Sequence, residues 1–198
     1  MDRSITSLTL LESLRDAADQ GAWQRFDDCY RPLVVKFARQ LGLWPHDAEE
    51  AGQRTMAAFC EAYRKKEYDC RKGRFKNWLL GIAQHKIADL RAEKLRQPLT
   101  PAERSSLEAV LANIRDPESL TAVWEQQWTH HVICLCLAQT RNQFTPRDMR
   151  IFECLTIHGQ TPEQVAETAN VPIKTVYNVK HRVLACMRTV GRELELSV

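Results

Sequence analysis

The 198-residue sequence has little glycine and no long apolar run, and each absence excludes a class of protein. Its seven glycines build no glycine-rich phosphate loop, and there is neither a nucleophile elbow nor a pair of catalytic carboxylates, so we expect no enzyme. No apolar run is long enough to span a bilayer, which argues against membrane insertion. The N-terminus shows no charged-then-apolar signal pattern, which predicts a cytoplasmic protein.

The seven cysteines include no Cys-x-x-Cys pair, so the sequence predicts neither a metal site nor a cofactor. The stretch of sequence that most resembles a cluster of metal ligands is "HHVICLC". On a helix His130 and Cys134 share a face, but Cys136 points away because two residues turn the chain by about 200°. A zinc site is the weaker interpretation of this stretch, and small buried apolar cysteines are the stronger one.

Positive charge is gathered in two blocks. Residues 64–96 hold eleven Lys or Arg against four acids, and residues 173–192 hold five basic residues and no acid. Between them, residues 98–128 carry five acids and two Arg. This distribution indicates two separate contacts with a polyanion, although basic runs are also common on solvated helix faces.

Apolar residues recur at helical spacing along most of the chain, which predicts an all-α fold of two small helical domains joined by a linker. Helices are expected from about His46 to Arg64, from Arg74 to Arg96 and from Leu120 to Thr140. An earlier apolar stripe contains Pro32, which should kink or split its helix. The stripe consists of Phe26, Tyr30, Leu33, Val34, Phe37 and Leu41.

Residues 161–187 read as two short helices with a tight turn between them. Thr161 is a helix cap, as is Thr145 before the preceding helix. Asn170 suits the turn because Asn tolerates the left-handed conformation. Apolar contacts can hold the second helix against the first. The residues that can make them are Val165, Val171, Val176 and either Val179 or Val183. Its exposed face would then present side chains that donate to phosphates and base edges in a major groove.

The stretch "FTPRDMRIFECLTIHGQTPEQVAETANVPIKTVYNVKHRVLACMR" resembles the promoter-binding domain of the sigma-70 family. Independently, "DAEEAGQRTMAAFCEAY" resembles the polymerase-binding helix of that family, and "YDCRKGRFKNWLLGIAQHKIADLRAEK" resembles its promoter-melting segment. The compact length points to the extracytoplasmic function (ECF) subfamily. The resemblance implies a sigma-2-like domain over 1–96, a linker over 97–119 and a sigma-4-like helix-turn-helix domain over 120–198.

The resemblance also implies a role for particular residues. Contacts with core RNA polymerase fall on Asp47, Glu50, Gln53, Met56 and Phe59. Contacts with the minus-ten promoter element, as duplex and as melted strand, fall on Tyr68, Arg71, Lys72, Arg74, Phe75, Lys76, His85 and Lys86. Contacts with the minus-thirty-five element fall on Lys174, Thr175, Tyr177, Asn178, His181 and Arg182. An anti-sigma factor is a further partner that such a protein can have.

Some positions depart from the family pattern. Gly52 stands where a larger aliphatic residue is usual, which indicates either a weak or a closely packed helix. His85 replaces a usual Asn, and the order of Val179 and Lys180 is nearly the reverse of the common one. The departures at His85 and at Val179 and Lys180 leave the base preference open. The competing hypothesis is a stand-alone helix-turn-helix regulator that binds duplex DNA without polymerase.

Overall fold

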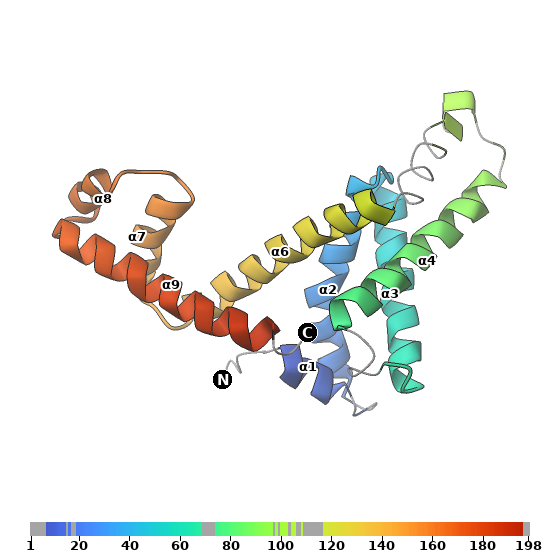
Figure 1. The fold of residues 1–198 in the computed structure, drawn as a ribbon, viewed down its shortest axis with the longest axis horizontal. Coiled ribbons are helices and arrows are strands. Elements are labelled where there is room, and N and C mark those ends of the chain that lie inside the picture. The colour runs from blue at the N-terminus through green and yellow to red at the C-terminus, as the bar shows by residue number, and fades with distance from the viewer. Residues whose placement is uncertain are drawn as a thin grey trace. The chain divides into compact units, whose positions relative to one another are not determined.

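The computed structural model describes residues 7–14, 16, 19–68, 74–96, 98, 100–102, 104–105, 108 and 117–195. These residues contain eight helices and no strand, which confirms the predicted all-α class. The helices are α1 (Ser7–Ser13), α2 (Gln20–Gln40), α3 (Pro45–Arg64), α4 (Phe75–Leu95), α6 (Pro117–Arg141), α7 (Pro146–Thr156), α8 (Pro162–Ala169) and α9 (Ile173–Glu195) (Figure 1). In the described parts of the chain, no helix is long and apolar enough to cross a membrane.

The chain divides into two compact units, one built on residues 9–131 and the other on residues 132–197. The division falls inside α6, which differs from the boundary expected at residue 120. The reason is the packing of the first half of α6, where Trp124 is fully buried and lies 5.0 Å from the ring of Phe37 in α2. Residues 117–131 therefore belong structurally to the N-terminal unit, and the roles assigned to the two domains remain predictions.

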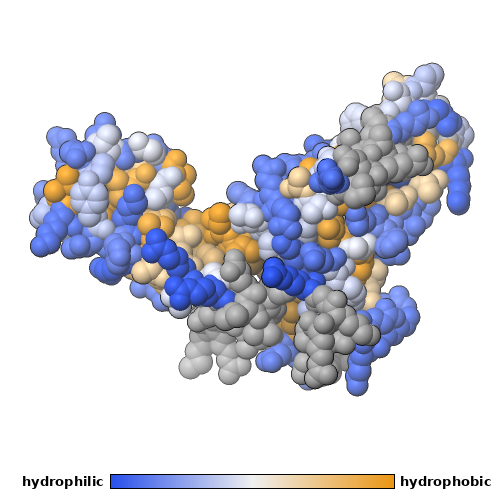
Figure 2. All heavy atoms as spheres, viewed as in Figure 1, coloured by the Kyte–Doolittle hydropathy of each residue, from blue (hydrophilic) through white to orange (hydrophobic). Residues whose placement is uncertain are grey.

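Aromatic rings form the core of the N-terminal unit. Phe26 of α2 stacks on Phe59 of α3 with centroids 4.2 Å apart, and Phe75 of α4 meets Phe59 edge-on at 5.8 Å. All three rings are at most 1% exposed. This core holds α2, α3 and α4 together, as their neighbouring ribbons show (Figure 1). Hydrophilic side chains cover much of the visible surface, with smaller apolar areas between them (Figure 2).

Pro32 does not split its helix, so that part of the expectation was wrong. α2 runs unbroken from Gln20 to Gln40 with Pro32 inside it. The proline ring is exposed, while the next two residues, Leu33 and Val34, are at most 1% exposed. Burial of this apolar face stabilises the helix enough to offset the one backbone hydrogen bond that proline cannot donate.

Gly52 lies at a close approach between α3 and α2, which favours the closely packed alternative. A Cβ at this position would lie 2.8 Å from Cγ2 of Val35 and 3.2 Å from Cγ of Arg31. Val35 is β-branched and cannot easily turn away. The glycine is therefore required by packing.

Replacing Gly52 by alanine should lower the free energy of unfolding by about 1–2 kcal/mol, because the overpacking cost exceeds the gain in helix propensity. Gly81 in α4 is the matched control, since a Cβ there would meet nothing within 4 Å. Gly81→Ala should stabilise the protein by up to about 1 kcal/mol. Denaturant unfolding of both variants measures the difference, and an equal response at the two positions would contradict the close packing.

Candidate functional site

The predicted helix-turn-helix is formed by α8 and α9. The Thr161 hydroxyl accepts a hydrogen bond from the Gln164 N–H, and the Gln164 side chain accepts one from the Thr161 N–H, so the capping box is complete. Asn170 ends α8 at φ 50° and ψ 57°, the left-handed conformation expected for the turn. The Arg147 guanidinium in α7 donates to the carbonyls of Ala169 and Asn170, which fixes the turn from outside.

Valines fasten α9 onto α7 and α8. Val176 and Val183 are fully buried, and Val179 is 2% exposed. Their spacing places them on one helix face, whereas Lys180 is exposed. The unusual order of residues 179 and 180 therefore keeps the core side of α9 apolar. The same core contains Met149, Ile151, Phe152 and Val165.

The other side of α9 presents the residues predicted to read the minus-thirty-five element. Five of the six are exposed, and Thr175 is half-buried. In the first half of the same helix, Ile173 and Lys180 are also exposed and were not predicted. The place of Ile173 at the first position of the helix, where recognition helices contact base edges, could have indicated it. The exposed predicted residues are Lys174, Tyr177, Asn178, His181 and Arg182.

Arg182 is held by its own unit. Its Nη2 lies 3.6 Å from Oδ2 of Asp148 in α7, and its guanidinium carbon lies 5.3 Å from the ring centroid of Phe144. Asp148 also follows the Thr145 cap, whose hydroxyl accepts the Asp148 N–H as predicted. Arg182 is thus the one residue of the predicted set for which an acidic partner is observed in the described structure.

Residues 69–73 lie outside the described residues, and with them the predicted minus-ten contacts Arg71 and Lys72. Tyr68 is half-buried and stacks on Trp78 at 4.8 Å with an angle of 27° between the rings. Phe75 is fully buried in the aromatic core. Its ring has no exposed face for a base, so the structure gives Phe75 a packing role where base contact was expected.

The basic side chains predicted for the minus-ten element differ in their surroundings. Arg74 and His85 are exposed. Lys86 lies 3.5 Å from the carboxylate of Asp89 on the same helix. Lys76 lies 2.7 Å from the carboxylate of Glu125 in α6, and its side chain is only 16% exposed. A phosphate could reach Lys76 only by replacing Glu125.

Three of the residues predicted to contact polymerase are buried. Phe59 belongs to the aromatic core, and Met56 is 4% exposed. The Asp47 carboxylate is also buried and pairs with the ammonium group of Lys94 in α4. Asp47 and Phe59 support α3 from inside and offer no surface to a partner in this conformation, which departs from the expected contact role, whereas Met56 lines the groove described below.

The remaining two predicted residues lie at the surface. Gln53 is exposed, and Glu50 is half-buried with Arg54 at 2.6 Å. Arg54 also donates hydrogen bonds from Nη1 and Nη2 to the carboxylate of Glu93 in α4. These bonds raise the pKa of Arg54, with Glu93 contributing most, and they lower the pKa of Glu93. The network ties α3 to α4 and leaves Gln53 as the free polar side chain of this set.

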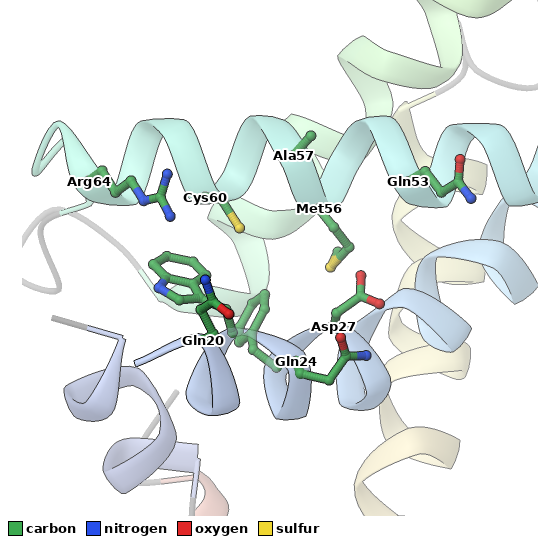
Figure 3. A pocket seen from close by; sticks show the side chains of 10 residues that line it. Gln20, Gln24, Asp27, Gln53, Met56, Ala57, Cys60 and Arg64 are labelled. Carbon is green, nitrogen blue, oxygen red and sulfur yellow. The ribbon is translucent and has the colours of Figure 1, made fainter. Parts of the chain in front are cut away.

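Gln53 borders a groove of about 360 Å³ between α2 and α3. In Figure 3, Gln20, Gln24 and Asp27 rise from α2 while Met56 and Cys60 point down from α3. Burial raises the pKa of the Cys60 thiol. The groove was not predicted, because its two sides are far apart in sequence. Its complete lining is Gln20, Trp23, Gln24, Phe26, Asp27, Gln53, Met56, Ala57, Cys60 and Arg64.

The "HHVICLC" stretch does not provide the group of possible metal ligands found among the described residues. Among the described residues, the grouping of three possible ligands is His46, Asp47 and Glu50. Both of its carboxylates are already paired with cations, Lys94 and Arg54. Paired carboxylates of this kind serve the packing of α3 against α4, so they are poor candidates for a metal centre.

The family model described as Sigma-70 region 2 matches residues 26–97, which include most of α2 and all of α3 and α4. A comparison with curated proteins finds no match. The family match supports a sigma factor of the sigma-70 family, a class of DNA-binding transcription initiation factors without enzymatic activity. This match agrees with the expectations of a sigma factor and of a non-enzyme.

Proposed function

We propose that the protein is an ECF sigma factor that binds core RNA polymerase in the cytoplasm and directs it to promoters. One observation carries the proposal. A segment that matches Sigma-70 region 2 and a complete helix-turn-helix occur in the same chain, in that order. A stand-alone regulator would need the second element and has no evident use for the first.

Polymerase would bind the side of α3 that faces away from α4. This side presents Gln53 and Ala57, and it continues across the groove to Gln24 and Asp27 of α2. Amides and one carboxylate around an apolar floor suit a basic and partly apolar helix of a partner. The buried residues Met56 and Phe59 would hold this surface in shape.

Promoter DNA would be held at two places. Arg74, His85 and Lys86 of α4 would hold phosphates of the minus-ten element, and Lys76 would join them by exchanging Glu125 for a phosphate. The exposed face of α9 would read the minus-thirty-five element. The linker at residues 97–119 would set the distance between the two contacts. An anti-sigma factor remains a prediction.

Gln53→Lys should weaken the binding of core polymerase at least about tenfold, because it adds a positive charge at the centre of the proposed contact. Gln40→Lys is the matched control, since Gln40 is exposed at the far end of α2 and does not line the groove. Both variants should melt at the wild-type temperature. Titration of labelled protein with purified core enzyme measures the affinity, and equal affinities for the two variants would contradict the proposed surface.

A further inference from the structure

Arg182 is bound to Asp148 although it lies on the helix that we expect to read DNA. The pair joins two elements, because Arg182 comes from α9 and Asp148 from the first turn of α7. Phe144, in the turn before α7, lies under the guanidinium at 5.3 Å. The Arg182 side chain is 59% exposed and that of Asp148 is 19% exposed, so the acid is the fixed partner and the arginine the mobile one.

From this arrangement we propose that Asp148 competes with DNA phosphate for Arg182 and so lowers the affinity of the protein for non-specific DNA. The proposal rests on the proposed function, because it assumes that α9 faces DNA. Residues 173–192 contain no acid, so this part of α9 supplies no negative charge against a phosphate. The carboxylate of α7 therefore provides a negative charge beside a helix that would otherwise attract any duplex.

The geometry indicates that Asp148 competes with phosphate for Arg182 and does not hold Arg182 in place for base recognition. An acid that supports an arginine for guanine recognition would hold it by short, parallel hydrogen bonds. Here the recorded approach is a single Nη2–Oδ2 distance of 3.6 Å, beyond hydrogen-bond length, and the guanidinium rests on an aromatic ring. The contact is weak enough for a phosphate to replace it.

The test measures binding of the full-length protein to a 40-bp duplex of mixed sequence, by fluorescence anisotropy over a range of salt concentrations. Asp148→Asn should tighten this binding by about threefold to fivefold, which corresponds to the upper range for an exposed ion pair. Arg182→Ala should weaken binding and reduce the slope of log K against log salt by about 0.9, the value for one phosphate contact. In the Arg182→Ala background, Asp148→Asn should have no further effect.

The matched control is Glu153→Gln on the same helix. It removes the same charge, but Glu153 pairs with Arg141 and not with a residue of α9. If Glu153→Gln tightens binding as much as Asp148→Asn does, the effect is one of net charge and the proposal is wrong. It is also wrong if Asp148→Asn weakens binding, or if Arg182→Ala leaves the salt slope unchanged.

Phe144→Leu provides a second route if Asp148→Asn unfolds the helix cap. This variant removes the ring beneath the guanidinium, and it should also tighten non-specific binding in a way that depends on Arg182. Failure of the proposed function would look different. A protein that does not bind core polymerase contradicts the sigma factor assignment, whereas the response of duplex binding to Asp148→Asn is measured without polymerase.

Discussion

Replacing Trp124 by alanine should lower the free energy of unfolding of the N-terminal unit by about 3–5 kcal/mol, the range for removing a buried aromatic side chain. Trp124 is fully buried, contacts the ring of Phe37 at 5.0 Å and lies 5.9 Å from Trp128. It is the main anchor of the first half of α6 on α2.

Trp124→Phe is the control. Among the described residues, the indole N–H of Trp124 is buried and finds no hydrogen-bond partner. Phenylalanine fills most of the space and removes that donor. The packing energy lost with the smaller ring and the desolvation penalty avoided by removing the N–H should largely cancel, so the free energy of unfolding should change by no more than about 1 kcal/mol. Guanidinium chloride unfolding followed by circular dichroism measures both variants. A loss below about 1 kcal/mol for Trp124→Ala would show that α6 does not pack on the N-terminal unit.

Lowering the pH should destabilise the packing of the first half of α6 on α2, because His131 lies in this contact. The imidazole lies against the rings of Tyr30 at 5.4 Å and Trp128 at 6.3 Å, with the Cys29 sulfur 3.7 Å from Nε2. Burial lowers the pKa of His131 from 6.5 to about 4, with smaller contributions from Lys36 and His130. Burial also raises the pKa of the Cys29 thiol to about 12, so both partners are neutral near pH 7.

The sign of the effect follows from the lowered pKa. Above pH 6.5 the imidazole is neutral in both the folded and the unfolded chain, and it imposes no dependence on pH. Between pH 6.5 and pH 4 only the unfolded chain takes up the proton, so stability falls by at most about 3 kcal/mol across this window. Below pH 4 both states are protonated and the loss is complete.

His131→Phe should remove this dependence on pH, because the ring packs without a titrating group. His130→Gln is the control, since His130 is exposed and adjacent. The experiment compares urea unfolding at pH 7.0 and pH 4.5 for the three proteins. If His131→Phe loses as much stability at pH 4.5 as the wild type does, the acid effect comes from other groups and the account of His131 is wrong.

Local signals in the sequence predicted much of the fold. The capping residues Thr145 and Thr161 and the left-handed Asn170 were predicted correctly, because each depends on a few neighbouring residues. The same holds for the starts and ends of α3 and α4, which follow the apolar period. The split considered at Pro32 does not occur. The effect of a proline depends on how strongly the flanking residues are buried, and no local pattern reports that.

The candidate site was harder to predict. A family resemblance assigns roles to positions in the sequence, but it does not tell whether the side chain at each position lies in the core or at the surface. The resemblance assigned Phe59 and Phe75 to partner contacts, and in this structure both are core residues. Asp47 and Lys76 are charged, but Lys94 and Glu125 neutralise them from other helices. Such pairings depend on helices that are distant in sequence, and only the folded structure reveals them.

The central claim is that this protein makes core RNA polymerase start at defined promoters. The most direct measurement is transcription in vitro from linear fragments of the genome that encodes the protein, with purified core enzyme and sequencing of the RNA 5′ ends. We expect new start sites that appear only when the protein is added and that share two upstream elements at a constant spacing. If the folded protein yields no start sites beyond those of core enzyme alone, the claim is contradicted.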